Sequence, residues 1–264
     1  YQARRMDGGG WQVQALGHRL SCADLQGGLP PGGTLHIVLS GPSIAAIGQP
    51  AQLARHPTVV VNGSFQILRD AGCRADLYVV SDVGFVRRQW SRFVAGVQAS
   101  RALAVDHRVL LEVLRRDPGV LEGTALRLFD NLLRPYGRPS CRWVRAMPPG
   151  VFGEGRSGVF SADPVFGYHP SCTVAYLALQ IAATQRPARI VLFGLDLGGD
   201  CARYYPEART EQSMLQKDLH GCILPHLALA ARALATMGIE VYNASPDSAL
   251  PASVIARLSP HEYL

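Results

Sequence analysis

Residues 188–197 read ARIVLFGLDL, an almost uninterrupted apolar run that reaches small and acidic residues at its end. Apolar runs without polar alternation are typical of strands that are buried on both faces of a parallel sheet. Three further runs, residues 35–40, 58–61 and 77–80, have the same character, and stretches of helical length lie between them. The pattern predicts an α/β fold, a parallel sheet flanked by helices with right-handed crossovers.

The rest of the chain fits this plan less completely. Residues 1–33 are Gly-rich and weakly patterned, and we expect an N-terminal arm or edge element there. Residues 34–264 are expected to form a single domain, with a Pro-, Gly- and Arg-rich insertion at about 118–170. Long loops in compact domains are often lids or binding loops. Further helices are expected over 44–54, 109–116, 172–184 and 211–237, and further strands over 101–105 and 238–243.

The composition is that of a globular protein, with 48% hydrophobic and 17% charged residues. A disordered chain would carry more charge and fewer apolar residues. No apolar run approaches the ~20 residues that cross a bilayer, and the first ten residues lack the apolar core of a signal peptide. We therefore expect a cytoplasmic protein whose contact with a membrane is at most peripheral.

The net charge of +6 comes from arginine, because Lys217 is the only lysine. This bias has two explanations: genomic composition, or guanidinium groups that bind phosphate or carboxylate. The positive charges are scattered rather than run together, which argues against a nucleic-acid partner. An anionic substrate or an anionic membrane surface fits the pattern better.

The six cysteines lie at wide, irregular spacings, and none forms a C-x-x-C pair. A structural zinc site is therefore not expected. Several of the cysteines fall in apolar segments, where an unpaired cysteine behaves as a small hydrophobe. We expect reduced thiols.

Small and polar residues follow five of the expected strands. In open α/β sheets, ligands bind in the crevice outside the carboxyl ends of the strands, and helix N-termini there offer amides to phosphate. The same residue types also make ordinary turns and caps, but five such segments in order favour a nucleotide or phosphorylated ligand. They are residues 40–43, 62–64, 81–82, 194–196 and 243–247.

Several familiar nucleotide and hydrolase motifs are absent from the sequence. There is no G-x-G-x-x-G, no P-loop and no G-x-S-x-G elbow, which weakens the dinucleotide, P-loop and hydrolase interpretations. Asp196 and Asp200 are too far apart to form a D-x-D metal motif. We expect no metal and no cofactor, so arginine, tyrosine hydroxyls and backbone amides would neutralise the phosphate.

These segments resemble the family of transferases that add a third 3-deoxy-D-manno-octulosonic acid (Kdo) to the lipopolysaccharide inner core, the WaaZ-like type. The similarity covers most of residues 35–255, with the middle third poorly matched. A more distant likeness is to bacterial sialyltransferases that use CMP-sialic acid. The matching positions are residues 40–42, 61–64, 78–83, 167–168, 172–173, 180–182, 188–190, 194–197, 218–219 and 242–247, with Cys201, Arg203 and Tyr205.

The resemblance implies a Rossmann-like, GT-A-type glycosyltransferase. It would move Kdo from CMP-Kdo to the Kdo–lipid A inner core on the cytoplasmic face of the inner membrane, peripheral to the anionic lipid surface. A transferase for another CMP-activated sugar acid, a non-catalytic nucleotide-binding module and a phosphate-ester hydrolase are the alternatives.

The resemblance also implies which residues meet the donor. Residues before the first helix would approach its phosphate or ribose, the next strand ends would line the same crevice, and the start of the buried helix would lie beside the cytidine. The donor-binding residues implied are Gly41, Pro42, Ser43, Asn62, Gly63, Ser81, Ser171, Cys172, Thr173, Asp196, Arg203 and Tyr204, although Asp196 could instead brace its strand end.

Three residues are implied to take part in catalysis. Tyr205 matches a segment whose tyrosine holds the leaving phosphate. Inverting transfer needs a group that takes the acceptor hydroxyl's proton, and the local candidates are Asp82 and His169. A helix N-cap is the alternative role of Asp82, and a loop histidine bonded to backbone that of His169. Neither His220 nor His226 matches the place of the sialyltransferase histidine convincingly.

Overall fold

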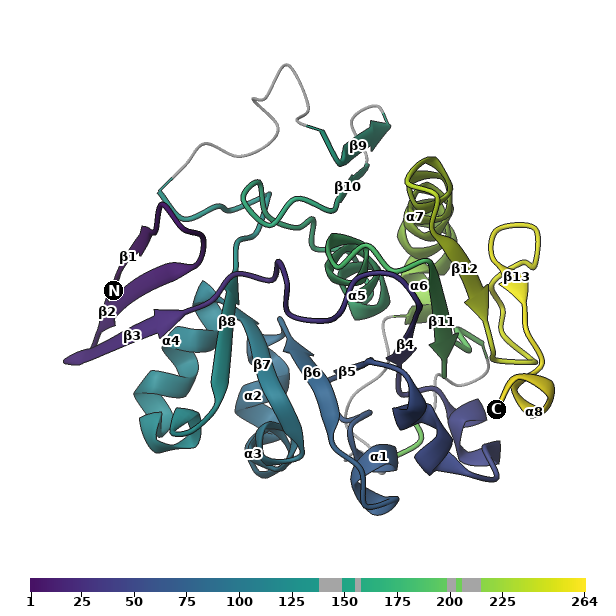
Figure 1. Ribbon diagram of the computed structural model, residues 1–264, viewed down its shortest axis with the longest axis horizontal. Helices are drawn as coiled ribbons and strands as arrows, with labels where there is room; N and C mark the ends of the chain where they lie inside the picture. The colour runs from purple at the N-terminus through teal and green to yellow at the C-terminus, as the bar shows by residue number, and fades with distance from the viewer. Residues whose placement is uncertain (138–148, 155–157, 199–202, 206–214) are drawn as a thin grey trace.

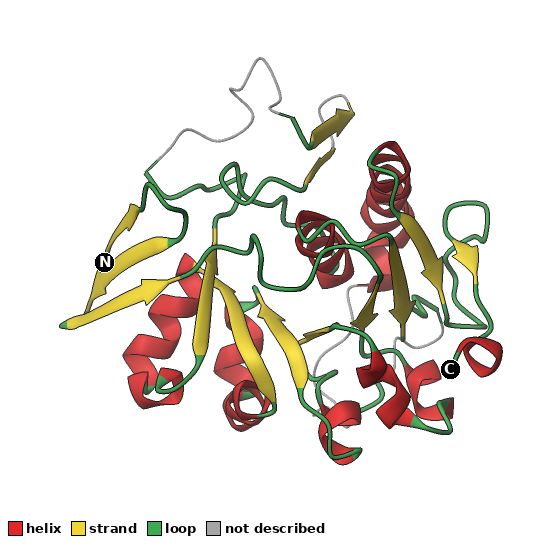
Figure 2. Ribbon diagram, in the orientation of Figure 1, coloured by secondary structure: helices red, strands yellow, loops and turns green. Residues whose placement is uncertain are grey.

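The computed structural model of the protein describes residues 1–137, 149–154, 158–198, 203–205 and 215–264 (Figure 1). Its main feature is an eight-stranded parallel sheet with the strand order β13-β12-β11-β4-β5-β6-β7-β8 (Figure 2). The strands are β4 (Thr34–Val38), β5 (Thr58–Val61), β6 (Ala75–Val80), β7 (Ser100–Asp106), β8 (Ala125–Phe129), β11 (Arg189–Phe193), β12 (Glu240–Asn243) and β13 (Ala256–Arg257).

Helices cover both faces of this sheet (Figure 1). Successive residues of a strand point to opposite faces, so Val59 and Val61 of β5 pack on one side and Val60 on the other. The first face meets α5 (Val174–Thr184), the π-helix Leu219–Ile223, which follows α6 (Leu215–Asp218), and α7 (Leu224–Thr236). The second meets η1 (Pro42–Ala46), η2 (Pro50–Arg55), α1 (Gln66–Asp70), α2 (Val83–Arg88), α3 (Trp90–Gln98), α4 (His107–Arg116), η3 (Pro118–Leu121) and α8 (Pro260–Tyr263).

The order in which the chain adds strands to the sheet reverses at β4, one of the two middle strands. From β4 the chain adds β5, β6, β7 and β8 on one side, and it later adds β11, β12 and β13 on the other. With right-handed crossovers, the two halves place their connecting helices on opposite faces. The carboxyl ends of β4 and β11 therefore flank a topological switch point, the place where open α/β sheets bind ligands.

The N-terminal segment is an edge structure rather than an extended arm. Strands β1 (Gln2–Arg5), β2 (Trp11–Ala15) and β3 (His18–Cys22) form an antiparallel sheet. Trp11 packs into the hydrophobic core on the second face of the main sheet. After β3, the N–H of Ala23 donates to the carbonyl of Leu126 on β8 at 3.0 Å. The segment thus covers the exposed edge of β8, which would otherwise offer unpaired backbone groups.

Two predicted elements differ from the structure. The expected helix over 44–54 is two 3-10 turns, η1 and η2, each beginning at a proline. The expected insertion at 118–170 includes too many residues, because β8 within this range is a strand of the main sheet. As an edge strand, β8 is only partly buried, so its sequence lacks the continuous apolar run by which the other strands were predicted. The rest of that region contributes the hairpin of β9 (Val151–Glu154) and β10 (Gly158–Ser161).

The long helix expected over 211–237 is present from Leu215 to Thr236 as α6, a π-helical turn and α7. Residues 206–214 lie outside the described part of the chain. The π-helical turn, Leu219–Ile223, directly precedes Pro225 in α7, and a proline lacks the N–H that would bond to the preceding turn. Among the helices that the structure describes, none combines the length and apolarity needed to span a membrane.

His36 on β4 makes the stability of the fold pH-dependent. Its side chain is inaccessible to solvent, Nδ1 donates to the Leu53 carbonyl at 2.8 Å, and Nε2 accepts from the Tyr263 hydroxyl at 2.9 Å. Burial, together with the neighbouring His56, lowers the pKa of His36 to about 4, against the opposing effect of the Leu53 bond. Native His36 therefore stays neutral where the unfolded chain takes up a proton.

We expect acid to destabilise the protein through His36. Below about pH 6.5 the unfolded state binds more protons, so stability falls between pH 6.5 and 4, by roughly 3 kcal/mol at ~1.4 kcal/mol per pKa unit. Chemical denaturation across this range should show a shallower loss for His36→Gln than for the wild type. His261→Gln, which removes an exposed histidine of α8, is the control. Equal slopes for His36→Gln and the wild type would contradict the assignment.

Candidate active site

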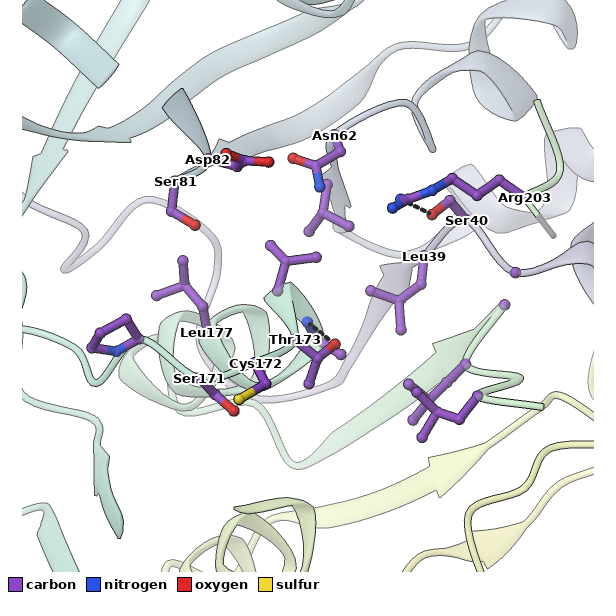
Figure 3. Close-up of a pocket in the computed structure, with 18 of the residues that line it drawn as sticks. Leu39, Ser40, Asn62, Ser81, Asp82, Ser171, Cys172, Thr173, Leu177 and Arg203 are labelled. Carbon is purple, nitrogen blue, oxygen red and sulfur yellow. Dashed lines mark hydrogen bonds between the residues drawn. The ribbon is translucent and has the colours of Figure 1, made fainter. Parts of the chain in front are cut away.

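A cavity of about 440 Å³ opens at the switch point. Residues after β4, β5, β6, β7, β8 and β11 line one side, and the start of α5 lines the other. Figure 3 shows Asn62, Ser81 and Asp82 across the cavity from Ser171 and Cys172. Of the predicted site residues, the lining includes Gly41, Pro42, Asn62, Ser81, Asp82, Ser171, Cys172, Thr173, Asp196 and Arg203.

The loop after β4 is held by the loop after β11. The N–H of Gly41 donates to the Gly194 carbonyl at 2.9 Å, and that of Ser43 donates to Oδ2 of Asp196 at 2.8 Å. Asp196 thereby satisfies an amide at the start of η1, as the bracing alternative predicted. The Ser43 amide is thus used within the protein, and Ser43 does not line the cavity.

Gly41 is required by the close approach of these two loops. A Cβ atom at this position would lie 2.5 Å from the Gly194 carbonyl oxygen and would also overlap the Asp196 carboxylate. Backbone oxygens cannot move aside as a flexible side chain can. Glycine is therefore the residue that lets the two strand ends meet.

Two buried acceptor oxygens at the cavity have no hydrogen-bond partner among the residues that the structure describes. They are Oδ1 of Asn62 and Oδ1 of Asp196. Asn62 ends β5 in the left-handed conformation, with φ of 48°, which asparagine tolerates better than most residues. Because buried polar atoms are nearly always paired, these oxygens indicate a ligand that brings donors such as hydroxyl or amino groups.

Arg203 reaches the cavity, whereas Tyr205 lies behind it. Nη1 of Arg203 donates to Oγ of Ser40 at 3.4 Å and to the Tyr205 hydroxyl at 3.3 Å. The Tyr205 ring is buried, 4.2 Å from the guanidinium of Arg92, and it occupies the space that a side chain at Gly63 would fill. The structure thus makes Tyr205 a support for Arg203 rather than a cavity-lining group.

Tyr204 contributes to this side of the cavity through its backbone. Its N–H donates to the Ser40 carbonyl at 2.8 Å, and its side chain does not line the cavity. Partial burial raises the pKa of its hydroxyl above the ordinary value for tyrosine.

The start of α5 forms the opposite wall. The Thr173 side chain caps the helix by accepting from the Ala175 N–H at 3.3 Å. Gln180 in the middle of the helix is fully buried and binds both backbone groups of His169, at 3.0 Å and 2.9 Å. This fixes the approach to Ser171, and the positive end of the helix dipole faces the cavity.

A disulfide replaces the reduced thiols expected at two of the six cysteines. Cys172 at the cavity is bonded to Cys222 of the π-helix, 50 residues away. The sequence spacing gave no signal of this pairing, because only the packing of α5 against α7 brings the two residues together. Cys22 and Cys73 are reduced, and Cys141 and Cys201 lie outside the described residues.

The two candidate bases have different environments. Asp82 lines the cavity with 53% of its side chain exposed, accepts the Gly84 N–H at 2.7 Å as the N-cap of α2, and lies 3.6 Å from Arg88. His169 is buried against the rings of Tyr176 and His226 and does not line the cavity. The alternative role of Asp82, the helix cap, is therefore realised, whereas for His169 it is the backbone, bonded to the Gln180 side chain, that is held in place.

Sequence reasoning missed three functional groups near the cavity. Asp106 and Arg108 line it at the end of β7, and Nδ1 of His226 lies 2.9 Å from Oγ of Ser171. Asp106 directly follows the strand predicted over 101–105, so the strand-end signal applied there too. His226 was considered from the sequence and set aside, because it did not match the place of the sialyltransferase histidine. Within the described ranges, no three His, Cys, Asp or Glu side chains gather as metal ligands.

We expect Gly41→Ala to disrupt the site. The added methyl must push the loop after β4 away from the loop after β11, which should lower the free energy of unfolding by ~1–3 kcal/mol. This movement should also abolish nucleotide binding, which is measured by calorimetry. Gly48→Ala is the matched control, because a Cβ there meets nothing within 4 Å. Unchanged binding in Gly41→Ala would show that this close approach does not shape the site.

Comparisons with known proteins agree with this architecture. The profile of the family described as 3-deoxy-D-manno-octulosonic acid transferase WaaZ matches residues 151–260. Two relatives are named probable 3-deoxy-manno-octulosonic acid transferase. The Salmonella typhimurium protein is 28% identical, over 86% of this chain and 87% of its own. The Escherichia coli K12 protein is 30% identical, over 83% of this chain and 80% of its own.

A solved structure shows the same fold. The MAf glycosyltransferase from Magnetospirillum magneticum AMB-1 matches 88% of this chain with a TM-score of 0.53 at 14% identity. The chain spans about a third of that protein, 34% of its length. Because a relative of 30% identity aligns with 83% of this chain, and the family profile matches residues 151–260, the chain belongs to the WaaZ family of 3-deoxy-D-manno-octulosonic acid transferases.

Proposed function

We propose that the protein transfers Kdo from CMP-Kdo to a Kdo residue of the lipid A inner core without a metal ion. The names of the two relatives support the transferred sugar. The main support for the proposal is the cavity, which is lined by Arg203, by the start of α5, and by Asn62 and Asp196 with their unpartnered oxygens. The proposal includes the Rossmann-like, GT-A-type assignment in a single domain, which the switch point of the sheet supports.

The donor's parts suit the groups around the cavity. A helix N-terminus and an arginine are both favourable partners for a phosphate. The α5 start and Arg203 provide them from two sides. Ribose hydroxyls and the cytosine amino group are donors that would pair with Oδ1 of Asn62 and Oδ1 of Asp196. A CMP-sugar therefore uses the positive and the acceptor groups of this cavity together.

The proposed reaction is a single displacement. An acceptor hydroxyl oxygen attacks the anomeric carbon of Kdo, the bond from that carbon to the phosphate oxygen breaks, and CMP leaves with the electron pair. Oriented donors such as Arg203 stabilise the charge that develops on the phosphate. The hydroxyl proton passes to a base, for which Asp82 is favoured over His169 because its carboxylate faces the cavity.

The acceptor places the reaction at a membrane surface. Lipid A carries phosphates, and the cytoplasmic leaflet of the inner membrane is anionic. The net charge of +6, almost entirely from arginine, favours peripheral attachment to such a surface. We include this cytoplasmic, peripheral location in the proposal.

Nucleotide preference tests the donor assignment. A ligand that binds the native state raises its stability by mass action, by about 2.7 kcal/mol at 100 times its Kd. We expect CMP to raise the melting temperature more than CDP, UDP, GDP or NAD, equally with and without EDTA. Preference for a nucleoside diphosphate or NAD, or dependence on a metal, would overturn the CMP-Kdo assignment.

Arg203→Gln should lower kcat for Kdo transfer by about 10²- to 10³-fold, as when an oriented donor is lost from a charge-stabilising site. Transfer from CMP-Kdo to a Kdo-terminated acceptor is measured by product formation. Arg55→Gln, at an exposed arginine at the end of η2, controls for the loss of charge. CMP binding without transfer by the wild type would indicate a binding module, and CMP release without acceptor a hydrolase.

A further inference from the structure

A second arginine lies at the other end of the cavity from Arg203. Strand β7 ends at Asp106, and α4 begins at the next residue. Asp106 is 3% exposed, and its Oδ1 accepts the N–H groups of Arg108 and Val109 at 3.0 Å and 2.8 Å. Its Oδ2 accepts Nη2 and Nε of the Arg108 side chain at 3.1 Å and 3.3 Å. The buried carboxylate therefore fixes both the helix start and the guanidinium.

The guanidinium of Arg108 keeps donors for a ligand. Its side chain is 54% exposed and lines the cavity. A guanidinium has five N–H donors, and Asp106 engages only Nε and Nη2. Nη1 has no partner among the residues that the structure describes, so it can donate toward the cavity.

Two neutral donors lie at the same end of the cavity. Asn131 lines it after β8, and its Oδ1 accepts the backbone N–H groups of Leu133 and Arg134, which leaves its amide nitrogen as a donor. The Ser81 hydroxyl lines the cavity after β6. A fixed guanidinium beside amide and hydroxyl donors suits a carboxylate, whose two oxygens accept several hydrogen bonds.

The spacing of the strands separates this end from the phosphate position. Arg203 is bonded to Ser40 after β4, whereas Arg108 follows β7. Three strand spacings of about 4.8 Å put the carboxyl ends of β4 and β7 roughly 14 Å apart, and the two side chains extend from positions near these ends. In CMP-Kdo the carboxylate sits on the same carbon that bears the phosphate, so with the phosphate beside Arg203 the donor's carboxylate stays near that end of the cavity. This favours the acceptor as the source of an anionic group beside Arg108.

We propose that Arg108, positioned by Asp106, binds the carboxylate of the acceptor sugar acid. The proposal rests on the proposed function, because it takes the nucleotide phosphate to lie near Arg203. It makes Arg108 a specificity-determining residue that selects an acidic sugar as acceptor. Asp106 is a positioning residue that acts through Arg108.

A binding experiment tests this without requiring turnover. The methyl glycoside of Kdo and the carboxyl methyl ester of that glycoside are titrated into the protein saturated with CMP. We expect the wild type to bind the acid at least tenfold more tightly than the ester. Arg108→Gln should weaken binding of the acid by about 10- to 100-fold, the worth of a hydrogen bond to a charged group, and should leave CMP affinity unchanged.

Two variants complete the design. Arg115→Gln removes an exposed arginine at the opposite end of α4 and should keep the wild-type preference for the acid. Asp106→Asn retains an oxygen for the helix cap but removes the charge that orients Arg108. It should reduce the discrimination between acid and ester while CMP binding stays intact, which a general loss of folding would not do.

The remaining outcomes each overturn the inference. If Arg108→Gln still preferred the acid over the ester as strongly as the wild type does, Arg108 would be excluded from the carboxylate site. Loss of CMP affinity in Arg108→Gln would place Arg108 on the nucleotide instead. Equal binding of acid and ester by the wild type would show that no carboxylate site exists. Failure of the proposed function is seen separately, as absent Kdo transfer or absent CMP binding by the wild type.

Discussion

The parallel pairing of β4 with β11 joins two parts of the chain that are far apart in sequence, and the site depends on it. Both strands are buried on their two faces, so their backbone groups can be satisfied only by neighbouring strands, and the loops can diverge only at the strand ends. There the Ser43 amide meets the Asp196 carboxylate across 153 residues of sequence. Gly41 permits this contact because it has no side chain. A cavity between the two halves of the sheet follows from this junction.

The opposite wall of the cavity is held by buried polar contacts rather than by the sheet. Helix α5 is buried almost all round, and Gln180 on it anchors the backbone of His169 just before the cavity. The disulfide between Cys172 and Cys222 ties the same wall to the segment that leads into α7. Functional groups placed on such rigid elements keep their geometry better than groups on loops.

The two arginines of the cavity follow one physical rule. A guanidinium on a flexible stem loses conformational entropy when it binds an anion, unless the protein has already fixed it. Arg203 is fixed by Ser40 and Tyr205, and Arg108 is fixed by Asp106. Each retains contact with the cavity. The cavity thus carries oriented positive groups at two separate places, which suits the proposed reaction between two anionic sugars.

The sequence by itself determined the class of fold and much of one side of the site. Unbroken apolar runs require burial on both faces, and polar residues directly after such runs must lie at the carboxyl edge of the sheet; Asn62, Asp82 and Asp196 were found this way. Tertiary structure alone decided the rest. The strand order, the pairing of Cys172 with Cys222, the retreat of Tyr205 behind Arg203 and the approach of His226 to Ser171 all depend on packing between distant segments. Local patterns report how a residue is buried, but they do not report which distant residue it is buried against.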